Sequence, residues 1–311
     1  MTQTVEPEQV AKSAQPGASP PLPRPSRRWA VPVILQLAAM LGIAVLLYPT
    51  ASNWFAERAQ QSAISGYNET VQTLSPNDRQ QKLAAAEAYN SKLPAGVLRD
   101  PYTNPDANAD TAAYSAYRDT LNLGDNGMIG ELSYPRLSID LPIYHGTSSE
   151  VLATGAGHLF GSSLPIGGPS THAVLTSHSG LTSAQLFTPL HQASAGDTFT
   201  INVLGETHYY QVQSTEVITP DQTDHLRIVN GQDLVTLITC TPIGINSHRL
   251  LVTAARIPAP DDSGLQTLAG HPGPGFPWWA VIFVAVSGAA AYILFVPPRR
   301  RRRTASTKEL Q

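Results

Sequence analysis

The sequence predicts a mainly β domain, a barrel or sandwich of seven or eight strands, preceded by a helical region and flanked by an apolar helix at each end of the chain. Three observations support this prediction. Two long apolar runs lie near the ends of the 311 residues, residues 49–123 have a helical texture, and residues 124–256 contain short β-rich runs separated by turn residues. The fold class is therefore a membrane-attached β protein.

Composition excludes several classes of protein. The chain is 42% hydrophobic and 14% charged, has a formal net charge of −3 and contains one cysteine. The charge balance excludes a polybasic nucleic-acid binder, and the single cysteine excludes a disulfide-stapled miniprotein. The apolar content is sufficient for a core, which excludes a wholly disordered or collagenous chain.

The two apolar runs are long enough to cross a membrane. Residues 29–48 contain Gln36 as their only strongly polar side chain and would span about 30 Å as a helix. Residues 278–296 carry no charge. Trp29, Tyr48 and Trp278 lie at the ends of these runs, where aromatic rings favour the membrane interface. We expect two transmembrane helices.

Charge predicts the orientation. Residues 1–28 hold four basic and two acidic side chains and residues 297–311 hold six and one, which leaves 10 basic and 20 acidic side chains between them. Basic flanks remain in the cytoplasm, so both termini are expected inside and the intervening domain outside. A cleaved signal peptide is the alternative for the first run, although that run is longer than the usual 7–15 residues and begins late in the chain.

The remaining segments have simple textures. Residues 1–28 are rich in Pro, Ser and Gln and are expected to form a disordered cytoplasmic tail. Residues 257–277 are rich in Pro and Gly, which predicts a flexible tether. Residues 297–311 form a basic cytoplasmic tail with five consecutive arginines.

One helix in the region 49–123 has clear boundary signals. Ser75 supplies a capping hydroxyl, Pro76 fits the first helical position and Asp78 places an acid in the first turn. The helix is expected to stop near Pro94 and Gly96. The β-rich runs that follow are MIGELSY, LSIDLPIY, HAVLTSH, DTFTINV, THYYQVQSTEVI, DLVTLITC and RLLVTAAR.

The lone cysteine, Cys240, is the first candidate for chemistry. In an exported domain a cysteine without a partner is a buried bystander, an intermolecular link or a reactive thiol. Cys240 ends a β-rich run, and Arg249 follows nine residues later at the start of the next run. If these runs are neighbouring strands, the guanidinium lies beside the thiol at the end of the sheet and favours a thiolate.

Thiol chemistry on an amide also needs a proton carrier, which histidine supplies near neutral pH. The chain has nine histidines, so the presence of one near Cys240 proves little. His178 is the best candidate because it ends a β-rich run and precedes a Ser-Gly turn. A solvated surface histidine is the alternative interpretation.

These residues match a known family. The region from about Gly124 to Arg256 resembles the sortases, and the whole architecture resembles the pilus-assembling class C group. The signature Thr-Leu-x-Thr-Cys stands here as residues 236–240, followed by TPIGINSHRLLV with Arg249 at the family spacing. The stretches LPIYHGTSSEVLATGAGHLFGSSLPIGG and SHSGLTSAQLFTPL are also similar to that group.

The resemblance implies an eight-stranded sortase β-barrel and a role for each matching residue. Cys240 would be the nucleophile, His178 the general acid and base, and Arg249 the group that binds substrate and stabilises the oxyanion. Thr239 and Ser177, which precede the cysteine and the histidine, would contact substrate. No metal or other cofactor is expected, since no cluster of ligands has convincing spacing.

Class C sortases also carry an N-terminal lid with an Asp-Pro-aromatic anchor. Asp100, Pro101 and Tyr102 fit that pattern within a lid loop at about 97–110, which would place Asp100 toward Arg249 and the Tyr102 ring over Cys240. Two departures stand out: the usual Gly-His-Arg-Gly is Ser-His-Ser-Gly at residues 177–180, and the lid aromatic is Tyr instead of Phe or Trp. The tripeptide would otherwise be read as an ordinary turn.

The implied function is a transpeptidase that cleaves a Leu-Pro-x-Thr-Gly sorting signal between Thr and Gly and transfers the acyl group to a lysine amine of a pilin. Its partners would be signal-bearing pilins or surface proteins, the lysine-bearing acceptor and the membrane, but no nucleic acid. It would face the cell wall from a Gram-positive plasma membrane. The alternatives are a housekeeping sortase that uses a cell-wall precursor, a cysteine hydrolase, and a non-enzymatic adhesin or sensor module.

Overall fold

The computed structural model describes residues 29–93, 98–103, 111–124, 127–260 and 273–296. The chain divides into two compact units. One comprises Met1–Ile43 with Ala285–Gln311, and the other comprises Ala44–Val284. The predicted cytoplasmic tails, 1–28 and 297–311, lie outside the described residues, as do parts of the predicted lid loop and tether. The predicted domain boundaries therefore stay predictions.

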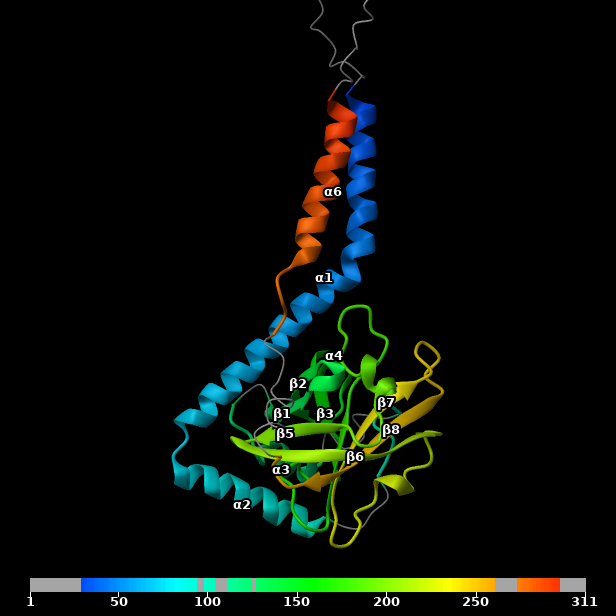
Figure 1. The fold of residues 1–311 in the computed structure, drawn as a ribbon. Helices are drawn as coiled ribbons and strands as arrows, with labels where there is room; N and C mark the ends of the chain where they lie inside the picture. The colour runs from blue at the N-terminus through cyan, green and yellow to red at the C-terminus, as the bar shows by residue number, and fades with distance from the viewer. Residues whose placement is uncertain (1–28, 94–97, 104–110, 125–126, 261–272, 297–311) are drawn as a thin grey trace, which may run out of the picture. The chain divides into compact units, whose positions relative to one another are not determined.

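The larger unit is built around a closed barrel of eight strands in the order β1-β2-β3-β4-β7-β8-β6-β5 (Figure 1). The predicted eight-stranded mainly β fold is confirmed. The strands are β1 (Met128–Tyr134), β2 (Ile139–His145), β3 (Ala156–His158), β4 (Thr171–Thr176), β5 (Thr198–Val203), β6 (Glu206–Ile218), β7 (Asp233–Thr241) and β8 (His248–Ile257). β7 lies between β4, to which it is parallel, and β8, to which it is antiparallel.

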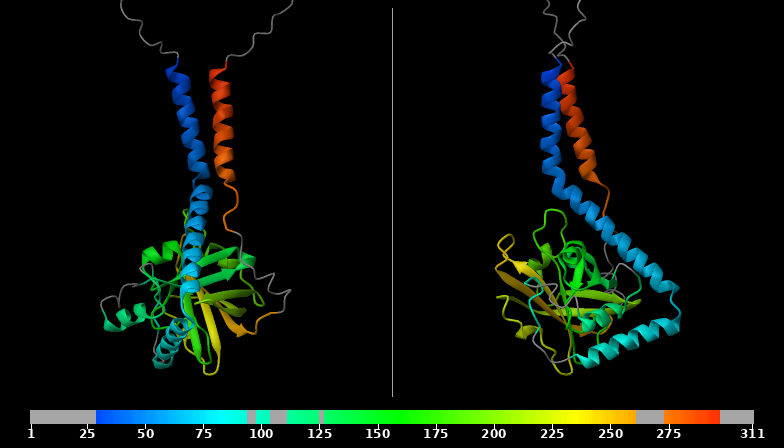
Figure 2. Two further views of the ribbon diagram at one scale, coloured as in Figure 1. Left: turned by 90° about the vertical axis from the view of Figure 1, so that its left-hand side faces the viewer. Right: turned by 180° about the vertical axis from the view of Figure 1, so that it is seen from behind.

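The helices precede, connect or follow the strands. They are α1 (Ala30–Thr73), α2 (Pro76–Lys92), α3 (Ala112–Asp119), α4 (Ser149–Thr154) and α6 (Trp278–Phe295), with short 3-10 turns at Pro135–Leu137, Thr188–Gln192 and Asp224–Leu226. The capping prediction for α2 is confirmed, because the Ser75 side chain accepts a hydrogen bond from the Asp78 backbone amide. Figures 1 and 2 show α2 running along the barrel, where the Asn90 side chain bonds both backbone groups of Leu164.

α1 extends well beyond the predicted apolar run that ends at Tyr48. It continues through Pro49, where a proline removes one backbone donor and favours a kink, and runs on to Thr73. Tertiary packing explains the continuation. Tyr67 is buried, donates its hydroxyl to the Ile129 carbonyl at 3.0 Å and accepts from the Leu204 amide at 2.9 Å. The second half of α1 is thereby part of the barrel domain.

Both α1 and α6 are long and apolar enough to cross a membrane, and they are the two such helices among the described residues. In the smaller unit, the Gln36 side-chain amide donates to the Ser287 carbonyl at 3.1 Å. The Trp29 and Phe295 rings stack with centroids 6.1 Å apart. These contacts join the two helices within the smaller unit, and the length and apolar composition of the helices suggest membrane anchoring.

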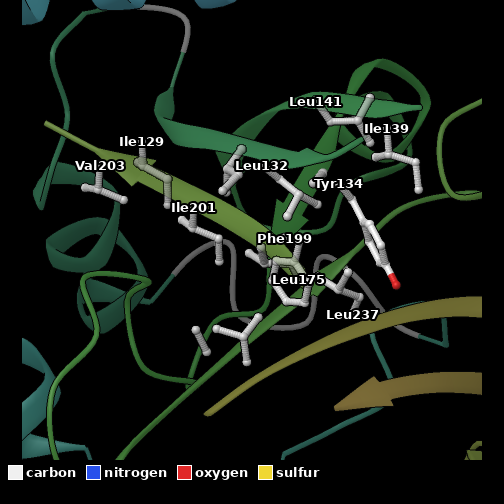
Figure 3. Packing of buried hydrophobic residues seen from close by; sticks show 14 of the residues in the cluster. Ile129, Leu132, Tyr134, Ile139, Leu141, Leu175, Phe199, Ile201, Val203 and Leu237 are labelled. Carbon is white, nitrogen blue, oxygen red and sulfur yellow. The ribbon is translucent and has the colours of Figure 1, made fainter. Parts of the chain in front are cut away.

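The barrel interior holds the main hydrophobic core (Figure 3). The side chains that fill it alternate along the strands, as Leu132, Phe199 and Ile201 do, while Leu175 and Leu237 contribute from β4 and β7. A second, smaller cluster lies outside the barrel wall. It consists of Leu159, Val174, Ile218, Leu226, Ile238 and Leu251, with Leu98 and Tyr102 packed against it. The segment 98–103, which precedes α3, therefore packs on this cluster through Leu98 and Tyr102.

Four buried histidines stand apart from the candidate site: His145, His158, His172 and His208. Burial lowers the pKa of His145 to about 4, of His158 to about 3 and of His208 to about 4. His158 contacts the Tyr117 hydroxyl and the Ser163 carbonyl. Neither ring nitrogen of His208 has a hydrogen-bond partner within the described structure. Burial therefore favours the neutral form of each of these rings in the folded protein.

We predict that the free energy of unfolding falls as pH is lowered from about 6.5 toward 4, because the unfolded histidines bind protons in that window and the folded ones do not. His208→Leu should reduce the loss between pH 7 and 5 by about 2 kcal/mol. Denaturant unfolding at both pH values measures this. Thr207→Leu, at the neighbouring exposed position, is the control, and an equal loss in both variants would refute the assignment.

Candidate active site

Cys240 and Arg249 face each other across two neighbouring strands. The antiparallel register of β7 and β8 pairs Cys240 directly with Arg249, as the nine-residue spacing predicts. Both side chains are largely buried, with exposed fractions of 8% and 7%. The connecting loop turns back at Asn246, whose carbonyl accepts from the Arg249 guanidinium at 3.0 Å. The guanidinium is thereby held at the same end of the barrel as the thiol.

His178 reaches this end of the barrel from the other side of β7. The parallel register pairs Thr176 of β4 with Ile238 of β7, and His178 and Cys240 each lie two residues further along. Ser179 then donates its hydroxyl to the Cys240 carbonyl at 2.7 Å. The three residues predicted as a catalytic set therefore lie on adjacent chain segments at one barrel end.

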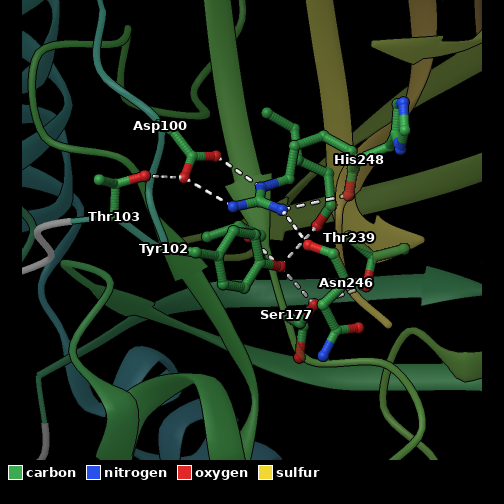
Figure 4. A network of polar contacts seen from close by, with 10 residues as sticks. Asp100, Tyr102, Thr103, Ser177, Thr239, Asn246 and His248 are labelled. Atoms are coloured by element: carbon green, nitrogen blue, oxygen red, sulfur yellow. Dashed lines mark hydrogen bonds and ion pairs between the residues drawn. The ribbon is translucent and has the colours of Figure 1, made fainter. Parts of the chain in front are cut away.

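Asp100 forms a two-pronged ion pair with Arg249 (Figure 4). The Arg249 Nε lies 2.7 Å from Asp100 Oδ1, and a terminal guanidinium nitrogen lies 2.9 Å from Oδ2. The side chains are only 9% and 6% exposed. Thr103 fixes the carboxylate by donating its hydroxyl to Oδ2 at 2.6 Å. A bidentate pair in this geometry is a strong, oriented contact.

Tyr102 packs between the ion pair and the end of β4 (Figure 4). Its ring centroid lies 4.9 Å from the Arg249 guanidinium carbon and 5.9 Å from the centroid of the His178 ring. Its hydroxyl donates to the Ser177 carbonyl at 2.7 Å and accepts from the Thr176 hydroxyl at 2.6 Å. Burial raises the pKa of this phenol, which keeps it a donor. Residues 98–103, the described part of the predicted lid loop, are called the lid segment below.

The lid segment shapes the electrostatics of the thiol. Burial raises the pKa of Cys240, the Arg249 charge opposes that rise, and the Asp100 carboxylate adds to it. Burial also lowers the pKa of His178. With the lid segment in place, the arrangement therefore favours a neutral thiol and a neutral imidazole.

Ser177 and Thr239, predicted as substrate contacts, are buried in the barrel wall. The Ser177 hydroxyl donates to the Gly155 carbonyl at 2.7 Å, and the Thr239 hydroxyl donates to the Ser177 carbonyl at 2.9 Å. Both hydroxyls join the ends of neighbouring strands, so their contact with a substrate stays a prediction. Within the part of the chain that the structure describes, no group of three or more His, Cys, Asp or Glu side chains could hold a metal ion.

Sequence reasoning missed the residues that hold the loop after His178. Ser179 was noticed only as a departure from the family pattern, yet it ties this loop to Cys240. Gly180 adopts φ of +76°, and a Cβ there would lie 2.4 Å from a methyl group of Ile243. Only a glycine permits that backbone conformation and that close approach between the two loops. The Ser-Gly turn was the available signal.

The geometry has clear counterparts among known proteins. Residues 132–257 match the sortase domain family. The crystal structure of sortase C-1 from Actinomyces oris is 47% identical over 59% of this chain and 100% of that one, with a TM-score of 0.57. This chain belongs to the sortase family. The predicted family and its enzyme class, the cysteine transpeptidases, are confirmed.

Other sortases extend the comparison. The structure of Streptococcus agalactiae sortase C1 in complex with MTSET is 42% identical, covers 64% of this chain and 96% of that one, and has a TM-score of 0.58. Sortase A of Streptococcus agalactiae serotype III is 30% identical over 117 residues, which is 37% of this sortase. The match spans 47% of the length of that curated relative. Structural similarity is thus to class C sortases.

We predict that Asp100→Ala increases the rate at which a small thiol reagent labels Cys240, by about tenfold or more, since the ion pair that seats the lid segment is lost. Tyr102→Phe should give a smaller increase, because it removes the hydroxyl contacts and keeps the ring. Intact-mass measurement of the full-length chain in detergent follows the labelling.

Asp224→Ala is the matched control for this experiment. Asp224 forms an exposed ion pair with Arg227, and its removal should leave the labelling rate unchanged. Equal labelling rates in Asp100→Ala and the parent protein would show that the lid segment does not shield the thiol.

Proposed function

We propose that this sortase is a pilus-assembling transpeptidase that cleaves a Leu-Pro-x-Thr-Gly sorting signal between Thr and Gly and transfers the threonyl acyl group to a lysine amine of a pilin. One observation carries the proposal: Cys240, His178 and Arg249 meet at one barrel end beneath a lid segment anchored on Arg249. The lid is the feature that favours pilus assembly over attachment to a cell-wall precursor.

In the first step, the Cys240 thiolate attacks the carbonyl carbon of the threonine. The C–N bond to glycine then breaks, and the protonated His178 imidazole donates its proton to the departing amine. The product is a thioester between Cys240 and the threonyl acyl group. Both side chains lie at the same end of the barrel, so a single bound peptide can reach them together.

In the second step, the uncharged lysine amine of the acceptor attacks the thioester carbonyl. His178 takes the proton from the nitrogen, an isopeptide bond forms, and Cys240 leaves as a thiolate. The same two residues therefore serve both half-reactions, with His178 alternating between acid and base. Attack by water at this stage would give hydrolysis as a side reaction.

Arg249 supplies the positive charge for the oxyanion of each tetrahedral intermediate. Its guanidinium is oriented by the carbonyls of Asn246 and His248, at 3.0 and 3.1 Å. In the closed arrangement its Nε and one terminal nitrogen are occupied by Asp100. The lid segment must therefore leave before these donors can face a substrate, which makes lid opening a step that precedes chemistry.

Membrane attachment fits this task. With α1 and α6 as spans and both termini in the cytoplasm, the barrel domain lies outside the plasma membrane and faces the cell wall. Substrates that are themselves held in the membrane then meet the enzyme at high effective concentration. The two-pass topology is part of the proposal.

We predict that the full-length protein in detergent, incubated with a Leu-Pro-x-Thr-Gly peptide, gains the mass of the peptide up to the threonyl acyl group. The adduct should be absent in Cys240→Ala and more abundant in a variant that carries Asp100→Ala. Arg249→Lys should slow its formation by about 10- to 100-fold, because one ammonium cannot replace the forked donors. Intact-mass spectrometry measures the adduct in the parent protein and in the three variants.

Adduct in the Cys240→Ala protein would exclude this nucleophile. A stable fold for that variant, shown by an unchanged thermal melt, separates loss of chemistry from loss of structure. The adduct measurement also tests the non-enzymatic alternative, which predicts no adduct in the parent protein or in any variant. Addition of a lysine-bearing pilin domain should release the acyl group as a covalent conjugate.

The pH dependence of kcat/KM should be bell-shaped. Its acidic limb reports His178, whose pKa is lowered by burial, and its alkaline limb reports Cys240, whose pKa is raised by burial and by Asp100. The reactive thiolate and imidazolium form is then a small fraction of the enzyme, so the reaction is slow. Asp100→Asn should move the alkaline limb to lower pH and increase the maximum rate, and an unmoved limb would contradict the coupling.

A further inference from the structure

Three exposed aliphatic side chains lie on the loops that flank the catalytic end of the barrel. Leu181, in the loop after His178, is 37% exposed. Ile243 and Ile245, in the loop between β7 and β8, are 49% and 72% exposed. Single exposed apolar residues are ordinary, but grouped ones at a functional end indicate an interaction surface.

The two loops form one surface. A Cβ on Gly180 would meet a methyl group of Ile243 at 2.4 Å, so the two loops lie directly against each other at these residues. Behind that contact, the Ser179 hydroxyl donates to the Cys240 carbonyl. We call Leu181, Ile243 and Ile245 the aliphatic rim, because they border the end of the barrel that carries Cys240.

The loop after His178, which carries Leu181 and is called the rim loop below, is attached to α1 near the end of the apolar run of that helix. The Ser52 hydroxyl donates to the Thr182 carbonyl at 3.0 Å, and the Gln185 amide donates to Asn53 Oδ1 at 2.6 Å. In Figure 1 this green loop rises from the barrel toward α1. Ser52 lies four residues beyond Tyr48, which is about 6 Å along a helix. The rim loop is therefore attached within about one helical turn of the predicted membrane edge.

An aromatic cluster lies next to the attachment points of the rim loop on α1. Trp54 and Phe55 of α1 pack against Trp279 at the start of α6, with ring centroids 6.3 and 5.6 Å apart from it. The Trp54 indole donates to the Gly275 carbonyl at 2.7 Å. Tryptophan and other amphipathic rings favour the headgroup region of a bilayer. The attachment points of the rim loop lie next to Trp54 in the sequence.

We propose that the aliphatic rim inserts into the outer leaflet of the membrane, so that the catalytic end of the barrel opens at the lipid surface. The rim would contact the boundary between lipid headgroups and acyl chains, where exposed aliphatic side chains are removed from water. The proximity of the rim loop to the membrane edge favours lipid over a protein partner. The inference rests on the proposed membrane attachment by α1 and α6.

This contact has a consequence for substrate access. A sorting signal that is itself held at the membrane would enter along the bilayer surface and would not need to be lifted into solvent. A barrel held away from the membrane would favour signals displayed at a distance. The rim thus selects peptides that lie within reach of the headgroups.

The test places single fluorophores on the full-length chain in a Cys240→Ala background, reconstituted into phosphatidylcholine–phosphatidylglycerol nanodiscs. Ile245→Cys and Leu181→Cys report on the rim. Val229→Cys, which is 43% exposed and precedes β7 at the opposite barrel end, is the matched control. Leu46→Cys, in the apolar run of α1, reports on membrane attachment. Lipids with a nitroxide near the headgroup end of the acyl chain quench fluorophores at that depth.

We expect strong quenching and a blue-shifted emission at residues 181 and 245, and neither effect at residue 229. Quenching at residue 46 without quenching at 181 and 245 would overturn the rim contact and leave the membrane attachment intact. Equal quenching at 229 and 245 would also overturn it, because the effect would not be specific to the rim. No quenching at residue 46 would overturn the attachment, and the rim contact with it.

Discussion

The position of β7 between β4 and β8 is the constraint on which the site depends. Strand registers are set by backbone hydrogen bonds and by which face is buried, so neither pairing can shift by one residue without turning the core side chains outward. The antiparallel pairing places Arg249 opposite Cys240, and the parallel pairing carries the segment ending in His178 to the same edge. Two strand pairings in the barrel wall thereby position Cys240 and Arg249 and bring His178 to the same edge. His178 lies just beyond the end of β4, and the contacts of Ser179 with Cys240 and of Gly180 with Ile243 hold its loop in place.

Much of the fold follows from local signals. The β-rich runs predicted every strand except the three-residue β3, and the cap at Ser75 predicted the start of α2. The spacing of Cys240 and Arg249 predicted their pairing because a short loop joins two adjacent strands. The full length of α1 could not be predicted from its own residues. The apolar run ending at Tyr48 and the helical texture after it were predicted as separate segments, and the packing of Tyr67 on the barrel explains why one helix continues through Pro49.

Contacts between distant segments were predicted only by resemblance or not at all. Asp100 and Arg249 are 149 positions apart, and no local pattern indicates that they meet. The family pattern supplied that expectation, and the bidentate geometry now gives it a physical basis. The attachment of the loop after His178 to Ser52 and Asn53 had no such guide, because it joins segments separated by more than a hundred residues. The hydroxyl and amide side chains involved are ordinary ones in a helix.

In the proposed mechanism, the lid segment and a substrate compete for the Arg249 guanidinium. Their competition makes the apparent affinity for substrate equal to the intrinsic affinity multiplied by the fraction of molecules that are open. A lid closed in about ninety-nine of a hundred molecules would weaken apparent binding by about a hundredfold without altering a single substrate contact. Under that mechanism, the strength of the ion pair between Asp100 and Arg249 sets how much substrate is needed for turnover. Sequence changes in the lid segment would then give enzymes that have the same specificity but need different substrate concentrations for turnover.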